Sequence, residues 1–313
     1  MKTCNTQYER LIADVVQRHL GEPVIGLTPI PTYPDSIVYT VQLAERTVIF
    51  KASDPAGRDP DGIALEAWAC ERVRAAGVPA PRVLAVDTST TLIPCSFFLM
   101  EQVTGQPLSS LTLPTAQHRR VVRQIGHVVR RIHTIPLDGY GWLDEAGYRA
   151  TGQVHGAAPT WPAAILAEVP ASLAYLEQTA AIDPGLANTI RRLIDAYRPL
   201  LACTTAGSLL HGDLGALHVW VDPVRERVTG VVDWGERSVG DPMWDLAAYE
   251  WDDVPVLLEG YAPDAAMEAT REIKFYLYAM LRAVPWACRW HAHGGAATIA
   301  WLKVTVREAV AHL

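Results

Sequence analysis

The residues most able to do chemistry lie in one stretch between positions 211 and 233. His211, Gly212 and Asp213 are followed by His218, and Asp233 ends an apolar run. Two carboxylates held at the ends of neighbouring strands can divide the work of phosphoryl transfer, since one orients an attacking hydroxyl while the other holds Mg²⁺ against phosphates. We predict the first role for Asp213 and the second for Asp233, because Mg²⁺ prefers oxygen ligands and needs few from the protein. The alternative is a pair of carboxylates that only accept hydrogen bonds from turn amides.

Two strands are predicted beside these carboxylates. The apolar runs 217–221 and 228–232 flank a turn at Asp222-Pro223, which is typical of an antiparallel pair. The first run begins just after Asp213, and the second ends just before Asp233. The sequence therefore predicts that strand ends position both carboxylates.

A lysine and a glutamate are placed in a similar way near the amino terminus. β-Branched and aromatic residues at 37–43 and 47–50 predict a hairpin whose second strand ends at Lys51. Residues 64–77 then have a helical pattern, and this helix contains Glu66. The hairpin and the helix therefore offer one cation and one carboxylate.

The remaining pattern predicts a β-rich part followed by a helical part. Further strands are expected at 82–86 and 96–100, and helices at 8–20, 116–135 and 186–201. The pattern changes from strand-like to helical near residue 104. Between residues 137 and 184 the periodicity is weak, and element boundaries there are open.

These motifs together resemble the aminoglycoside phosphotransferase family, a small-molecule branch of the protein-kinase-like superfamily. HGDLGALHVWVD is similar to the family's HGD-x4-N loop, and VTGVVDWGERSVGDPMWDLA to its metal-binding segment with the trailing GDP-x2-DLA. The resemblance implies an α+β, two-lobed kinase-like fold. It implies a small β-rich nucleotide-binding lobe at residues 1–104 and a larger, mainly helical catalytic and substrate-binding lobe at residues 105–313.

The same resemblance implies which residues bind the nucleotide. Lys51 is similar to the lysine that contacts the α- and β-phosphates, and Glu66 to its ion-pair partner. Residues 98–103 resemble the hinge between lobes, where backbone groups of Glu101 and Val103 would bind the base. The expected donor is ATP or GTP, with Mg²⁺ as cofactor.

Two positions depart from the family pattern. The loop expected over the phosphates reads Thr-Tyr-Pro-Asp-Ser at 32–36 and has no glycine, so Ser36 and nearby backbone amides are the expected phosphate contacts. His218 replaces the usual asparagine, which exchanges an amide oxygen for an imidazole nitrogen, a poorer magnesium ligand. We interpret His218 and Asp233 as a variant metal site, with a purely structural hydrogen bond of His218 as the alternative. The same exchange occurs in related branches that modify aminoglycosides or macrolides, several of which accept GTP.

Other polar residues near the motifs are predicted to be structural. His211 is interpreted as a packed histidine that shapes its loop, and His133 as a core histidine. Asp241 and Asp245 are expected to cap a helix and brace the loop of Asp213. Most of the ten tryptophans are expected to be core anchors.

Composition excludes several classes of partner. The chain has 313 residues and a formal net charge of -7, which disfavours nucleic acid because phosphate backbones are bound by clustered Lys and Arg. The five cysteines are scattered without a CxxC pair, and neither a secretory signal nor a membrane span is evident. We therefore expect a cytoplasmic enzyme that binds a small molecule and a nucleoside triphosphate. The oligomeric state is open.

The acceptor is the least determined part. An aminoglycoside is the leading expectation, because Glu250, Asp252 and Asp253 could form an acidic pocket for a polycation. A macrolide would instead require an apolar trough, for which the aromatic stretch 275–301 is suited. A metabolic kinase for choline, homoserine or a sugar would use the same motifs. A nucleotide-binding pseudokinase is the non-enzymatic alternative.

Overall fold

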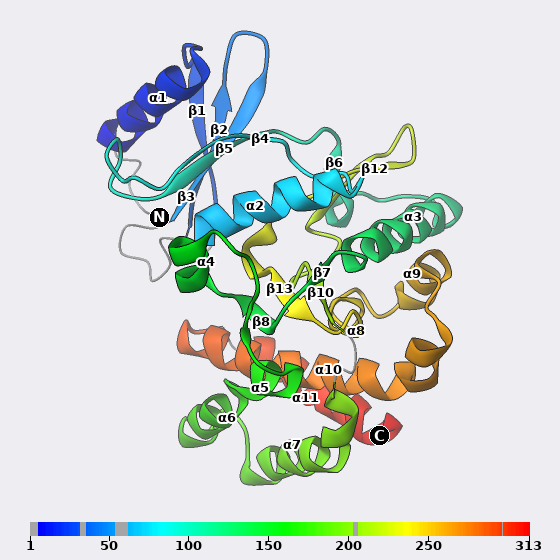
Figure 1. Ribbon diagram of the computed structural model, residues 1–313. Helices are drawn as coiled ribbons and strands as arrows, with labels where there is room; N and C mark the ends of the chain where they lie inside the picture. Colours follow the sequence, from blue (N-terminus) through cyan, green and yellow to red (C-terminus); the bar gives the residue numbers. More distant parts are fainter. Residues whose placement is uncertain (1–5, 32–35, 54–61, 203–205, 296) are drawn as a thin grey trace. The chain divides into compact units, whose positions relative to one another are not determined.

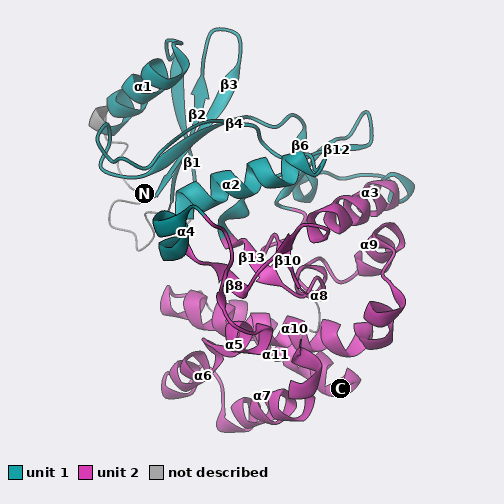
Figure 2. Ribbon diagram, viewed as in Figure 1, with its two compact units in different colours: residues 1–117, 145–152, 217–235 teal, residues 118–144, 153–216, 236–313 magenta. Residues whose placement is uncertain are grey.

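The chain is described by a computed structural model for residues 6–31, 36–53, 62–202, 206–295 and 297–313 (Figure 1). It divides into two compact units (Figure 2). Unit 1 comprises residues 1–117, 145–152 and 217–235, and unit 2 comprises residues 118–144, 153–216 and 236–313. The lobe boundary expected at residues 104 and 105 stays a prediction. None of the helices in the described ranges combines the length and hydropathy that a bilayer crossing needs.

Unit 1 contains a five-stranded antiparallel sheet in the order β1-β2-β3-β5-β4. The strands span Gly26–Ile30 (β1), Ser36–Gln42 (β2), Thr47–Ser53 (β3), Val83–Asp87 (β4) and Phe97–Glu101 (β5). β2 and β3 form the predicted hairpin, with Gln42 paired to Thr47 across the turn. A second, three-stranded sheet contains β12 (Arg227–Val231), β11 (Val219–Asp222) and β6 (Gln106–Pro107) in that order.

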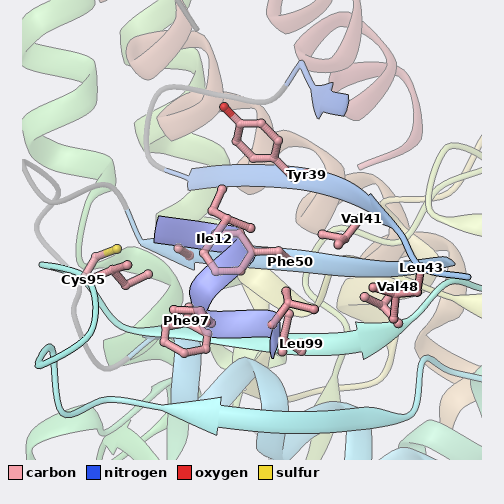
Figure 3. Packing of buried hydrophobic residues seen from close by; sticks show 13 residues of the cluster. Ile12, Tyr39, Val41, Leu43, Val48, Phe50, Cys95, Phe97 and Leu99 are labelled. Carbon is pink, nitrogen blue, oxygen red and sulfur yellow. The ribbon is translucent and has the colours of Figure 1, made fainter. Parts of the chain in front are cut away.

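One face of the five-stranded sheet is buried by helix α1 (Thr6–Leu20). Ile12 of this helix packs in one cluster with Phe50 of β3 and Phe97 and Leu99 of β5 (Figure 3). Successive side chains of a strand point to opposite faces, so Lys51 and Phe98 face away from this cluster. That second face is where Ile63 and Ala67 of helix α2 (Gly62–Ala75) pack against Phe98.

Unit 2 contains a second five-stranded sheet and most of the helices. The sheet order is β7-β10-β13-β8-β9, and all its neighbours are antiparallel. Its short strands are Pro136–Leu137 (β7), Tyr140–Leu143 (β8), Gly156–Ala158 (β9), Gly207–Leu210 (β10) and Ser238–Gly240 (β13). The helices are Thr115–His133 (α3, which begins in unit 1), Trp161–Leu166 (α5), Val169–Gln178 (α6), Pro184–Tyr197 (α7), Met243–Leu246 (α8), Val254–Tyr261 (α9), Ala265–Ala292 (α10) and Ala297–His312 (α11). Unit 1 also contains the short helix α4 (Glu145–Thr151).

Two glycines allow α3 and α9 to approach closely. A Cβ on Gly126 of α3 would lie 2.1 Å from the carbonyl oxygen of Leu257, and one on Gly260 of α9 would lie 1.9 Å from that of Arg123. Both obstacles are backbone atoms, which cannot rotate away. Any larger residue at either position would therefore separate the helices.

Gly126→Ala is expected to destabilise the protein although alanine is the better helix former. In an exposed helix the change would stabilise by about 1 kcal/mol, whereas forcing two backbones apart costs roughly 1–3 kcal/mol. Urea unfolding of the variant should show a lower midpoint. Gly26→Ala in β1 is the matched control, because its Cβ would meet only the Gln42 side chain at 3.7 Å. Equal midpoints for Gly126→Ala and wild type would mean that α3 and α9 tolerate separation.

Candidate active site

Three charged side chains form an ion-pair network in unit 1. The Nζ of Lys51 lies 2.6 Å from Oε1 of Glu66 and 2.9 Å from Oδ1 of Asp233. Burial alone would lower the pKa of Lys51, but the charges of Glu66 and Asp233 and their hydrogen bonds outweigh it and raise that pKa. Lys51 therefore stays an ammonium group, and the structure brings together three of the residues that the sequence singled out.

The register of the strands explains this network. Lys51 pairs with Phe98 across β3 and β5, on the sheet face where α2 packs, and that helix carries Glu66. Asp233 follows β12 in the left-handed backbone conformation, with φ of 63°. Such a conformation is uncommon for a residue other than glycine and concentrates at functional sites, where surrounding structure enforces it.

His218 lies beside Asp233. Its Nε2 is 3.8 Å from Oδ2 of Asp233, and its carbonyl oxygen accepts a 2.9 Å hydrogen bond from the amide of Val232. The backbone of His218 thus continues the pairing of β11 with β12, while its ring faces the carboxylate. The side chain of His218 is 15% exposed and that of Asp233 is 50% exposed, so the carboxylate is open to solvent.

These residues fit a magnesium ion that arrives with a nucleotide. Across the described residues, no group of three or more His, Cys, Asp or Glu side chains is placed to hold a metal by itself. Asp233 offers a hard oxygen, and Mg²⁺ is commonly bound by one or two carboxylates with phosphates and water completing its shell. The donor set therefore suits a shared site better than a resident metal.

Asp213 belongs to unit 2, in the loop that follows β10. The buried carboxylate of Asp245 in α8 accepts hydrogen bonds from the amides of His211 at 2.7 Å and Gly212 at 2.9 Å. His133 of α3 lies 3.1 Å from the same carboxylate. The predicted brace by Asp245 is confirmed, and so is the burial of His211 and His133.

Further contacts fix the shape of this loop. Gly212 has φ of +85°, and a Cβ there would lie 1.7 Å from the carbonyl oxygen of Glu236, so no other residue fits. Arg282 of α10 donates a 2.8 Å hydrogen bond to the carbonyl oxygen of Gly212 and lies over the ring of Trp244. Asp241 accepts from the amide of Met243 at 3.0 Å, but Pro242 is the N-cap residue of α8 and Asp245 lies inside that helix, so neither aspartate caps it as expected.

Asp213 lines a cavity of about 670 Å³ in unit 2. Its other chemically distinctive lining residues come from the α8–α9 connection and from α10 and α11: Tyr249, Glu250, Trp251, Arg282, Trp286, Trp290 and Trp301. The sequence indicated this region through Glu250 and through the many aromatic residues between 275 and 301. It gave no signal for the contribution of Arg282 or Tyr249.

The three carboxylates expected to bind the acceptor lie in different surroundings. Glu250 lines the cavity, and its Oε1 accepts a 2.8 Å hydrogen bond from the amide of Ala216. Asp253 is instead engaged by His118, with both carboxylate oxygens 2.8 Å from Nε2. Asp252 is exposed and is not among the residues that line this cavity.

The remaining nucleotide-binding predictions fall in unit 1. Glu101 and Val103 line a hollow of about 530 Å³ with Trp220. The amide of Glu101 already donates to the carbonyl oxygen of Arg82, at 2.9 Å. Ser36 opens β2, and residues 32–35 of the expected phosphate loop lie outside the described residues.

Comparison with solved structures identifies the fold. The chain shares 18% identity with a thermostable variant of aminoglycoside phosphotransferase APH(4)-Ia in complex with AMP-PNP and hygromycin B. That match has a TM-score of 0.69 and covers 95% of this chain and 98% of the other. APH(2")-IIIa, solved with GDP and kanamycin, is 13% identical, with a TM-score of 0.66 and coverage of 98% and 99%. The predicted α+β kinase-like fold is confirmed.

Sequence comparison identifies the family. Acyl-CoA dehydrogenase family member 10 of Mus musculus is 25% identical over 271 residues, which are 81% of this chain. The chain spans about a quarter of the length of that relative. A sequence model of the phosphotransferase enzyme family (APH) matches residues 28–280. The chain, with its HGD loop held by Asp245 and its Lys51–Glu66–Asp233 network, belongs to the phosphotransferase enzyme family.

Proposed function

We propose that this protein transfers the terminal phosphoryl group of a nucleoside triphosphate to a hydroxyl group of a small molecule. The observation that carries the proposal is the buried cation Lys51 held between Glu66 and the half-exposed carboxylate of Asp233. A lysine in this setting is preorganised to meet phosphate oxygens, because it is charged and its position is fixed before the nucleotide arrives. ATP and GTP are both candidate donors, since structures of the same fold contain AMP-PNP or GDP.

The nucleotide contacts would come from unit 1. Lys51 would contact the phosphates, Glu66 would keep it in place, and Val103 would supply the backbone donor to the base, because the amide of Glu101 is engaged. Asp233 and His218 would hold Mg²⁺, which neutralises charge on the phosphates. Ser36 remains the expected phosphate contact at the edge of β2.

Asp213 would orient the acceptor hydroxyl and accept its proton. It lines the unit 2 cavity, and the two residues before it are held in place: Asp245 accepts from the amides of His211 and Gly212, and Arg282 donates to the carbonyl oxygen of Gly212. Four residues separate Asp213 from His218, and a five-residue step spans at most about 18 Å. The chain itself therefore tethers the proposed catalytic base to the proposed metal site.

Positioning accounts for most of the proposed catalysis. Phosphoryl transfer passes through a loose transition state in which little covalent chemistry is left to the protein. An aminoglycoside, a macrolide and a small metabolite are the candidate acceptors. The aminoglycoside is supported by the fold shared with proteins solved with hygromycin B or kanamycin.

Asp213→Asn is expected to lower kcat by about 10²–10⁴-fold while the dissociation constant of Mg-nucleotide stays within about twofold of wild type. Asp233→Asn should instead weaken Mg-nucleotide binding. Coupled nucleotide-consumption assays and calorimetric titration separate the two effects. Asp195→Asn on α7, with a side chain 74% exposed, is the control. Full activity of Asp213→Asn would overturn the assignment of the base, and nucleotide binding without turnover in wild type would indicate a pseudokinase.

His218→Asn is expected to improve the use of magnesium. The change restores an amide oxygen, so the Mg²⁺ concentration for half-maximal activity should fall by roughly 10-fold. The ratio of activity with Mn²⁺ to activity with Mg²⁺ should also fall, because Mn²⁺ accepts imidazole more readily. His155→Asn, at a half-exposed position beside Asp144, is the control. An unchanged metal dependence in His218→Asn would show that His218 does not contact the metal.

Asp245→Asn is expected to destabilise the protein by roughly 2–4 kcal/mol, because an amide donor would face the buried amides of the loop. Burial alone would raise the pKa of Asp245, but the hydrogen bond and charge of His133 and the neighbouring loop lower it. Its stabilising effect is therefore complete above the ordinary aspartate pKa and is lost as pH falls through the lower folded-state pKa. Urea unfolding from pH 7 to pH 3 should show that the difference in free energy of unfolding between wild type and variant becomes smaller in acid. A gap that stays constant would contradict this role, and Asp195→Asn should show no gap.

A further inference from the structure

Arg282 of α10 is a buried cation that binds neutral groups. It is 6% exposed. It donates a 2.8 Å hydrogen bond to the carbonyl oxygen of Gly212, and its guanidinium carbon lies 5.0 Å from the centroid of the Trp244 ring. Arginine keeps its charge in proteins, and a buried charge is costly unless opposite charges lie nearby. The carboxylates around Arg282 therefore decide what its charge does.

Three carboxylates provide the opposing charge. Burial lowers the pKa of Arg282, and the charges of Asp245, Asp213 and Glu236 oppose that effect. Asp245 already accepts hydrogen bonds from the loop amides and contacts His133. Asp213 lines the cavity of about 670 Å³ together with Arg282, and it follows the residue whose carbonyl oxygen Arg282 binds. Asp213 is thus the carboxylate most directly placed to respond to this charge.

Glu236 has a cation of its own. It lines a second, smaller cavity of about 100 Å³ in unit 2, together with Gly212, Arg282 and Arg289. The Nη1 atom of Arg289 lies 3.4 Å from Oε1 of Glu236. Burial raises the pKa of Glu236, and the charge of Arg289 opposes this more strongly than that of Arg282. The charge of Glu236 is therefore matched mainly by Arg289.

The surroundings of Arg282 fix the place of its charge. Arg282 lines both cavities, so its side chain forms part of the wall between them. The Trp244 ring and the Gly212 carbonyl group hold the guanidinium group there. A carboxylate rotates easily about its last bond, and a fixed positive charge nearby favours one orientation. Positioning carries most of the acceleration in phosphoryl transfer, so the orientation of Asp213 affects turnover.

We propose that Arg282 is a positioning residue of the transfer, whose charge holds the carboxylate of Asp213 in the orientation that receives the acceptor hydroxyl. The hydrogen bond to Gly212 fixes the backbone of the loop, whereas the charge acts on the side chain that follows. This inference rests on the proposed function, because it takes Asp213 as the group that orients the hydroxyl.

Chemical rescue separates the charge of Arg282 from its hydrogen bond. Arg282→Ala leaves a space that opens to both cavities. Guanidinium ion and urea are planar molecules of similar size with N–H donors, and only guanidinium carries the charge. At about 50 mM, both are far below the molar concentrations that unfold proteins, and sodium chloride at the same concentration controls for ionic strength.

Turnover is measured as nucleotide consumption with Mg²⁺ and either ATP or GTP. The acceptors are hygromycin B, kanamycin, erythromycin, choline and water, and the one that gives the highest wild-type kcat is used for the variants. Calorimetric titration measures the dissociation constant of Mg-nucleotide for each protein.

Loss of the charge is expected to reduce kcat while nucleotide binding is retained. Arg282→Ala should lower kcat by about 100-fold, because a small misplacement near the reacting groups costs about that much. Guanidinium should raise the kcat of this variant by at least about 10-fold, and urea by less than about twofold. The dissociation constant of Mg-nucleotide should stay within about twofold of wild type.

Two further variants serve if Arg282→Ala does not fold. Arg282→Lys keeps the charge and should retain kcat within about 10-fold of wild type, whereas Arg282→Gln keeps an N–H donor for Gly212 and should lose about 100-fold. Arg130→Gln is the matched control, because Arg130 also lies over a ring, that of Tyr261 at 6.0 Å, and donates to the Tyr261 carbonyl oxygen at 2.8 Å. Its kcat should equal that of wild type.

The outcomes distinguish this inference from the proposed function. Equal rescue by urea and guanidinium, or wild-type kcat in Arg282→Gln, overturns the role of the charge. If neither compound restores turnover, Arg282→Lys decides, and a kcat no higher than that of Arg282→Gln overturns the inference. A loss of nucleotide affinity as large as the loss of kcat also overturns it. Consumption of neither nucleotide by wild type with any acceptor refutes the proposed function, and with it any part of Arg282 in the transfer.

Discussion

The geometry of the proposed catalytic loop depends on one buried carboxylate. Asp245 is fully buried. It accepts hydrogen bonds from the amides of His211 and Gly212, and it contacts His133. A buried charge is costly unless donors surround it, so the fold must supply all of these partners at once. The loop after β10, helix α3 and helix α8 are thereby held in one arrangement. The position of Asp213 is a consequence of that requirement.

Much of the setting of Lys51 could be predicted from the sequence because it follows from local periodicity. Alternation in β3 places Phe50 in the core with α1 and Lys51 on the face of α2, and the hairpin and helix bounds follow from turn and apolar patterns. The contact between Lys51 and Glu66 then follows, because β3 and α2 pack against each other on that face of the sheet. The sequence also indicated that Asp245 braces the loop of Asp213, because Asp245 belongs to the segment that resembles the family's GDP-x2-DLA motif.

The surroundings of the unit 2 cavity could not be predicted in the same way, because they depend on contacts between distant segments. The pairing of Asp253 with His118 joins residues 135 positions apart, and nothing near Asp253 in the sequence indicates it. The cavity likewise combines the α8–α9 connection with two later helices. Short strands such as β7 and β13 were missed for a related reason, since two or three residues carry no periodic signal and are defined by their partners.

Helix α10 links loop and cavity through a single row of side chains. Lys274 and Tyr278 bind Asp241, Arg282 binds the carbonyl oxygen of Gly212, and Trp286 and Trp290 line the cavity, each four residues after the last. Four residues turn a helix by about 40° more than one full turn, so the row winds gradually from the loop to the cavity. Substitutions at Trp286 or Trp290 would therefore change the lining of the cavity while the contacts of Lys274 and Tyr278 with Asp241 and of Arg282 with Gly212 stay in place.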